Sequence, residues 1–158
     1  MTVAELKRAY VHNKPKVKKR NPDPAPAVPA HLIKGYVNEN VFEDDLLYCL
    51  IEITPPSVNN YWIKGKNKTN RLSLRAKHFN AVMKRFINPC GYGGKVQVDI
   101  QFAPPDRKIR DIDNIVKPIF DSLSKCGLIL DDKQVEKLTV ERLPIKKGGE
   151  LTVYVRKI

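Results

Sequence analysis

The chain has 158 residues, enough for one domain plus a tail, and its 42% hydrophobic and 29% charged residues are typical of a globular protein. It has no apolar run near the roughly 20 residues that span a bilayer, no signal-peptide core, and no CxxC spacing among its three cysteines, which together favour a reducing cytoplasm. The formal net charge of +12 favours a polyanionic partner, because each cation set against a phosphate releases condensed counterions, although charge alone does not separate DNA from RNA or from an anionic membrane surface.

Residues 1–44 have the composition of a basic, proline-rich arm. Within 1–34, eight basic residues stand against two acidic ones, a net charge of +6. The stretch NPDPAPAVPA over 21–30 has closely spaced prolines, which remove backbone donors and favour an extended polyproline conformation. A Thr and a Glu at capping-box spacing predict a short helix over 2–11. The basic side chains of this arm are expected either to be solvated or to touch DNA.

The folded domain is expected over 45–158. The dense apolar run LLYCLIEI over 46–53 contains β-branched residues and predicts a buried strand. Ser73 is a candidate N-cap for a helix whose apolar residues recur at helical spacing until Asn88-Pro89 ends it. The segment KVQVDIQF over 95–102 alternates apolar and polar residues, which predicts a second strand.

A second helix and two more strands complete the predicted domain. The helix runs over about 114–126 and is closed by Gly127 as a left-handed cap. LTVERL over 138–143 and ELTVYV over 150–155 alternate as strands, and PIKKGG between them is read as a hairpin connection. The order β-α-β-α-β-β predicts an α+β fold, a single compact domain with one mixed β-sheet and helices packed on it.

Two pairs of acidic residues flank the second predicted helix: Asp111 and Asp113 before it, Asp131 and Asp132 after it. In an extended segment, residues 111 and 113 point to the same face, and with a third carboxylate they would form a hard-oxygen site suited to Mg²⁺ or Mn²⁺. The helix would span roughly 20 Å. The two groups therefore converge only if the first segment extends alongside the helix or if the chain after Gly127 folds back along it. The alternative is a helix cap and a turn.

Basic residues surround these acids. Arg107, Lys108 and Arg110 precede them, and Lys117 follows Asp113 by four positions. Carboxylates that hold a metal beside cations that hold phosphate are what a phosphodiester substrate needs. Lys117 could also form an ordinary i,i+4 pair with Asp113. The basic neighbours make a phosphate-handling metal site the better interpretation.

The segment 57–72, SVNNYWIKGKNKTNRL, is expected to be a polar loop that interleaves aromatic and basic residues. Aromatic rings can stack on exposed bases while cations follow the phosphate backbone. The predicted DNA contacts in this loop are Lys64, Lys66, Lys68, Arg71 and Trp62. Trp62 could equally anchor the loop on the core, and the sequence leaves both interpretations open.

The compound string RDIDNIVKPIFDSL…G…LDDKQV, with PPSVNNYW upstream and PIKKGGELTV downstream, resembles the RusA family of Holliday junction resolvases found in phages and prophages. The resemblance covers roughly 50–155, and 1–44 has no matched counterpart. It implies a homodimeric, Mg²⁺-dependent endonuclease that nicks four-way DNA junctions with paired, symmetric cuts. It assigns the essential carboxylates to Asp111, Asp113 and Asp132, the catalytic lysine to Lys117 and the preceding basic residue to Arg110. Asp121 and Asp131 fit the pattern without a defined role.

We therefore expect a structure-specific DNA endonuclease of recombination and repair, with no small-molecule cofactor, in the cytoplasm of a bacterium or a phage-infected host. A dimer suits the task, because two active sites related by a two-fold axis could cut symmetric strands. Lys117 is expected to stabilise charge on the phosphate or to orient the attacking water. Two alternatives remain: a nuclease that acts on forks or flaps, and a non-catalytic basic accessory protein that binds DNA through charge alone.

Overall fold

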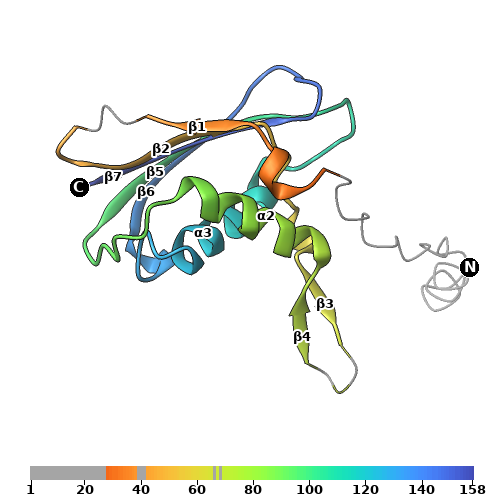
Figure 1. Ribbon diagram of the computed structural model, residues 1–158, viewed down its shortest axis with the longest axis horizontal. Coiled ribbons are helices and arrows are strands. Elements are labelled where there is room, and N and C mark those ends of the chain that lie inside the picture. The colour runs from red at the N-terminus through yellow and green to blue at the C-terminus, as the bar shows by residue number, and fades with distance from the viewer. Residues whose placement is uncertain (1–27, 39–41, 66, 68) are drawn as a thin grey trace, which may run out of the picture.

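The computed structural model describes residues 28–38, 42–65, 67 and 69–158. In this part of the chain, two helices cover one face of a five-stranded mixed sheet with the strand order β1-β2-β7-β5-β6 (Figure 1). The α+β class expected from the sequence is confirmed. The helix expected over 2–11 lies outside the described residues. Among the described helices, none is long and apolar enough to cross a membrane.

Three central strands build the core side of the sheet: β2 (Asp45–Ile51), β5 (Val96–Ala103) and β7 (Glu150–Lys157). β7 lies between the other two and pairs antiparallel with both. Because side chains alternate along a strand, every second residue of these strands, such as Val98 and Val153, points under the helices and is fully buried. The alternation seen in the sequence therefore corresponds to one covered and one open face.

The first helix, α2 (Leu74–Phe86), begins where the sequence predicts. The Ser73 hydroxyl accepts a hydrogen bond from the Ala76 amide at 3.1 Å, which satisfies one of the free amides of the first turn. Phe79 and Val82, one turn apart, are buried against the sheet. The predicted N-cap and the apolar helix face are both confirmed.

The second helix, α3 (Val116–Lys125), is preceded by a 3₁₀ turn, η4 (Ile112–Ile115). Pro118 lies in the first turn of α3, where a missing amide donor costs no helical hydrogen bond. The helix ends at Lys125 and is closed by Gly127, whose φ of +78° is the left-handed conformation that glycine adopts without strain. The segment predicted as one helix is thus a 3₁₀ turn followed by an α-helix.

The predicted hairpin between the last two strands is wrong. β6 (Val135–Arg142) lies at the edge of the sheet and pairs in parallel with β5, while β7 pairs with the other side of β5. The connection closes over the end of β5 instead: the Leu143 amide donates to the Phe102 carbonyl at 2.9 Å. Alternation identifies a strand but not its neighbour in the sheet. Here β5, α3 and β6 form a β-α-β crossover, which places β6 in parallel beside β5.

Part of the segment assigned to the arm belongs to the sheet. β1 (Gly35–Val37) pairs antiparallel with β2 and forms the other edge. A Cβ at Gly35 would come within 2.8 Å of the Leu50 carbonyl oxygen and of the Phe86 ring, so a glycine permits this close approach. Residues 28–38 therefore contact the folded domain, which the sequence analysis expected to begin at residue 45.

The predicted loop 57–72 contains a short hairpin. β3 (Trp62–Lys64) and β4 (Asn70–Leu72) pair antiparallel as a separate two-stranded sheet. Figure 1 shows this hairpin projecting from the helix layer, away from the five-stranded sheet. Lys66 and Lys68, two of the predicted DNA contacts, lie outside the described residues.

Candidate active site

The chain after α3 returns along the helix, which brings Asp132 to Lys117. The amides of Cys90 and Gly91 donate to the Gly127 carbonyl at 3.0 and 2.8 Å, and this fixes the reversal. Asp132 is the first residue of a 3₁₀ turn, η5 (Asp132–Gln134). The Lys117 ammonium lies 2.5 Å from the Asp132 carboxylate. Of the two chain paths considered in the sequence analysis, the fold-back after Gly127 is present, and it brings Asp132 to Lys117.

Lys117 lies between two carboxylates. Besides Asp132, it contacts Asp121 at 2.8 Å, one turn further along α3. Hydrogen bonds to Asp121 and then to Asp132 raise the pKa of Lys117 above its ordinary value. The ammonium therefore stays protonated at neutral pH. Lys117 can stabilise negative charge on a phosphate but is not available as a general base. Asp121, which the sequence left without a role, holds this lysine.

Asp131 is a helix cap. Its carboxylate accepts a hydrogen bond from the Lys133 amide at 3.0 Å, and this bond is the main cause that lowers the pKa of Asp131. Gln134 completes a reciprocal capping box with it. The cap turns the Asp131 side chain toward the backbone, while the next carboxylate, Asp132, meets Lys117. The geometry thus separates the two adjacent aspartates, which spacing alone does not.

Gln134 is a positioning residue that the sequence analysis did not single out. Its side-chain oxygen accepts hydrogen bonds from the Leu130 and Asp131 amides, both at 2.8 Å. Its side-chain amide donates to the carbonyls of Tyr92 and Gly94 at 2.8 and 2.7 Å. One side chain therefore fixes η5 to the segment GYGG over 91–94. The only sequence signal was its place in the string LDDKQV.

Asp111 and Asp113 do not share one extended segment. Asp111 has extended backbone angles, but Asp113 lies inside the 3₁₀ turn η4. Residues three apart eclipse in a 3₁₀ helix, and the Asn114 side-chain amide accordingly lies 3.4 Å from the Asp111 carboxylate. Among the described residues, the exposed Asp113 carboxylate has no hydrogen-bond or ion-pair partner. The common face expected from strand periodicity is therefore not formed.

The carboxylates fit a divalent cation by chemistry, although no ligand cluster is assembled. Within the described ranges, no group of three or more His, Cys, Asp or Glu side chains is placed to hold a metal ion. Asp132 is engaged by Lys117, whereas Asp111 and Asp113 are open to solvent. Oxygen-only, solvent-accessible donors are the type that Mg²⁺ prefers, because this ion keeps several waters. The predicted ligand set Asp111, Asp113 and Asp132 remains a prediction.

The basic residues before the acids have different roles. Arg110 makes a two-pronged ion pair with Asp106, at 2.6 and 3.2 Å, and holds the pKa of that carboxyl at about 2. Arg107 and Lys108 are exposed in the same loop. Ile109, which follows them, is 96% exposed, an unusual position for a large apolar side chain. Arg107 and Lys108 are thus free to meet phosphate, while Arg110 shapes the loop.

Tyr61, rather than Trp62, anchors the base of the hairpin. The Tyr61 ring is fully buried and its hydroxyl accepts a hydrogen bond from the Asn80 amide at 3.2 Å, whereas Trp62 is 47% exposed. The Lys125 ammonium lies 5.3 Å from the centroids of both rings. The sequence gives no local signal for this contact of Lys125, because Lys125 is 64 residues from Tyr61 along the chain. The exposed indole remains available to a ligand.

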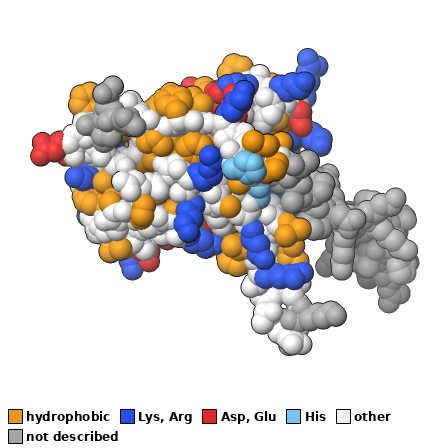
Figure 2. All heavy atoms as spheres, viewed as in Figure 1, with side chains coloured by type: hydrophobic (Ala, Val, Ile, Leu, Met, Phe, Trp, Pro, Cys, Tyr) orange, Lys and Arg blue, Asp and Glu red, His pale blue; other side chains and the backbone are white. Residues whose placement is uncertain are grey.

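The hairpin carries exposed cations. Lys64 ends β3 and Arg71 lies on β4, and both side chains are exposed. Figure 2 shows Lys and Arg side chains over the helix layer and toward the base of the hairpin, whereas acidic side chains appear mainly near the periphery of this face. A surface of this kind suits the phosphate backbone of a nucleic acid.

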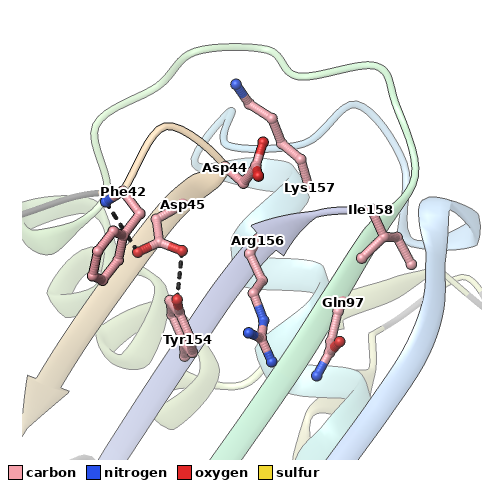
Figure 3. Close-up of a pocket in the computed structure, with 8 residues that line it drawn as sticks. All are labelled: Phe42, Asp44, Asp45, Gln97, Tyr154, Arg156, Lys157 and Ile158. Carbon is pink, nitrogen blue, oxygen red and sulfur yellow. Dashed lines mark hydrogen bonds between the residues drawn. The ribbon is translucent and has the colours of Figure 1, made fainter.

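A separate pocket of about 430 Å³ lies at one end of the sheet (Figure 3). Its lining comes from the start of β2, from β5 and from β7, and includes no residue of η4, α3 or η5. Two of its charged groups are already engaged: the Tyr154 hydroxyl donates to Asp45, and Arg156 lies 3.4 Å from Asp99. We therefore place the candidate site at η4, α3 and η5.

The fold and the site define a basic α+β protein in which acidic residues and a protonated lysine lie beside exposed basic side chains. A family model described as "Endodeoxyribonuclease RusA" matches residues 52–156. The proteins named crossover junction endodeoxyribonuclease RusA from Shigella sonnei (strain Ss046), Escherichia coli (strain K12) and Enterobacteria phage 82 are each 34% identical over 105 residues, covering 64% of this chain and 87% of theirs. The chain belongs to the RusA family of endodeoxyribonucleases. The resemblance and the enzyme class expected from the sequence are confirmed.

Proposed function

We propose that the protein resolves four-way DNA junctions by Mg²⁺-dependent, paired nicking of two symmetric strands. The observation that carries the proposal is the contact between Lys117, on α3, and Asp132. The solvent-exposed carboxylates of Asp111 and Asp113 lie in the segment that leads into α3. The name that the relatives carry, crossover junction endodeoxyribonuclease, supports the substrate.

In this proposal, each side chain has a task that its surroundings allow. Lys117, kept protonated by its two carboxylate partners, stabilises the charge that develops on the scissile phosphate. Arg107 and Lys108, exposed on the adjoining loop, hold the neighbouring phosphates. Asp111, Asp113 and Asp132 would hold Mg²⁺, which supplies Lewis-acid stabilisation of the phosphate when bound.

The proposal includes a homodimer that acts in the cytoplasm of a bacterium or of a phage-infected host. Paired cuts need two active sites, and a two-fold axis gives both sites the same geometry. The organisms of the relatives, two bacteria and a phage, support this setting.

The test compares the unmodified chain with Asp113→Asn on a synthetic four-way junction, a fork, a flap and a linear duplex. The variant should bind the junction as tightly as the unmodified chain and lose cleavage by about 100-fold or more, because the change removes charge without changing size. Asp44→Asn, an exposed change in the separate pocket, should cleave normally. Undiminished cutting by Asp113→Asn would contradict the assigned site, and preferred cutting of forks or flaps would contradict the substrate.

A further inference from the structure

β6 is a long edge strand with an open outer side. Six of its eight residues are exposed, although its neighbours β5 and β7 are largely buried. Its backbone pairs with β5 on one side, and no other described segment pairs with it. The opposite edge strand, β1, has three residues. An unpaired strand of this length presents a row of free amides and carbonyls that can pair with another chain.

Two faces of β6 follow from its register with β5. Leu138 and Val140 pair with the buried core residues Val98 and Ile100, so they lie on the helix side. Lys137, Thr139 and Glu141 alternate with them and lie on the open face of the sheet. Leu138 is 41% exposed there, a further sign that the helix side of the edge is incompletely covered.

The sequence of β6 is complementary to itself in one register. If two copies pair antiparallel with Thr139 opposite Thr139, Lys137 faces Glu141 of the second copy and Leu138 faces Val140 of the second copy. Symmetry makes each of these pairs occur twice. Opposite charges and apolar pairs that face each other across antiparallel strands are both stabilising.

Neighbouring registers lose this match. A shift of one residue would put the open-face side chains opposite those of the helix face. A shift of two residues would place either Lys137 or Glu141 opposite Thr139, so no Lys–Glu pair forms. The alternating charges could also serve only to keep the edge unpaired, as charged edge strands often do. That interpretation does not account for their symmetric order about Thr139.

We propose that β6 is the interface between two copies of this chain, joined antiparallel about a two-fold axis through Thr139. The axis stands perpendicular to the sheet, so the helix layers of both copies face the same side. Because η5 runs directly into β6 and η4 packs against it, the two candidate active sites lie on that side, one on each side of the axis. The inference rests on the proposed dimer but not on metal binding or cleavage.

Charge exchange tests the register, with the oligomeric state measured by sedimentation without divalent metal. Lys137→Glu and Glu141→Lys each set like charges opposite each other twice, so each variant alone should dimerise at least about tenfold more weakly than the unmodified chain. The double variant should regain the dimer. A mixture of the two single variants should form a heterodimer, because positions 137 and 141 then carry opposite charges at both of their contacts. Lys77→Glu on α2 is the matched control and should leave the dimer intact.

Disulfide trapping tests the axis independently. Opposite residues of antiparallel strands have Cα atoms about 4.5–5.5 Å apart, within disulfide range. In a Cys90→Ser background, which removes the exposed thiol, Thr139→Cys should form a covalent dimer on oxidation. Lys137→Cys should not, because its two copies would lie about 13 Å apart along the strands.

Three results would overturn the interface: a dimer that neither single charge variant weakens, single variants that are weakened but not rescued together, and crosslinking at 137 rather than 139. A chain that stays monomeric would overturn both the interface and the proposed dimer. The β6 variants change exposed side chains, and unchanged circular dichroism spectra and melting temperatures would show that they fold. The Asp113→Asn assay would still report separately on the nuclease.

Discussion

At the scale of single residues, the candidate site separates cations that are already paired from cations that are free. Lys117 contacts Asp121 and Asp132, and Arg110 is held by Asp106. Arg107 and Lys108 have exposed side chains in the same loop. A paired cation has a fixed position and a secured charge, whereas a free one can follow the substrate. The first kind suits charge stabilisation at the reacting phosphate, and the second suits binding of the DNA backbone.

The ion pair of Asp106 gives a prediction for pH. The pKa of Asp106 is about 2, below the ordinary 3.8, mainly because Arg110 hydrogen-bonds to the charged form. The stabilisation is therefore present above pH 3.8 and is lost as the pH falls through about 2. In Arg110→Gln, the pKa of Asp106 should rise toward 3.8, as measured by NMR titration of the carboxyl carbon. In Arg107→Gln it should stay near 2. Equal titration of Asp106 in both variants would refute the assigned cause.

At the scale of elements, two short segments place the functional side chains. η5 carries Asp132 and is fixed by the four hydrogen bonds of Gln134, while the β3–β4 hairpin presents Trp62 above the buried Tyr61. Each segment is too short to hold its own conformation, since single turns and isolated hairpins are marginal in water. Their positions depend on contacts with the main domain.

Gln134→Ala tests the attachment of η5. The change removes partners from four backbone groups, so we expect a loss of about 1–3 kcal/mol in the free energy of unfolding, measured by urea denaturation. Cleavage should fall as well, because Asp132 loses its fixed place. Lys133→Ala alters the neighbouring, largely exposed side chain and should stay within about 0.5 kcal/mol. If both variants were equally stable, Gln134 would not anchor the turn.

The hairpin prediction compares two adjacent aromatic residues. Trp62→Ala should weaken junction binding about tenfold, since stacking of a base on an aromatic ring contributes about 1–3 kcal/mol, with a small effect on stability. Tyr61→Ala should instead lower stability by about 3–5 kcal/mol, because it empties a buried site. Fluorescence anisotropy of labelled junctions and thermal melting separate the two effects. A Trp62 variant that melts early and still binds DNA normally would reverse the assignment.

At the scale of the whole molecule, charge and sheet topology determine how the protein meets DNA. The net charge is +12, and the helix layer and hairpin present cations on one side (Figure 2). The sheet supplies a rigid support on the other side of the helices, with β6 open at its edge. DNA binding and self-association are thus assigned to different surfaces, and the two can be tested separately.

The salt dependence of junction affinity tests the basic surface. The logarithm of the association constant should fall linearly with the logarithm of the salt concentration, with a slope of about −0.9 for each phosphate contact. Lys64→Ala and Arg71→Ala should each flatten this slope by about one contact. Lys95→Ala, whose ammonium is paired with Glu136 at 3.1 Å, should leave it nearly unchanged. Slopes that do not differ among the three variants would remove the hairpin from the DNA interface.

The sequence by itself indicated most of the main local elements and the candidate residues of the site. Ser73 marks a helix start, a dense apolar run marks β2, alternation marks β5 and β7, and the spacing of Asp111, Asp113, Lys117 and Asp132 marks the family. These signals depend on residues a few positions apart, or on a motif that is read in order, so they need no knowledge of the chain path.

Only the tertiary structure decided which of these residues meet. It placed β6 beside β5 rather than β7, folded the chain after Gly127 back along α3, and paired Lys117 with a carboxylate fifteen residues away. It also assigned Asp131 to a cap and Arg110 to Asp106. Partners of this kind are chosen by the path of the backbone and by the packing of the core, which local periodicity and propensity do not encode.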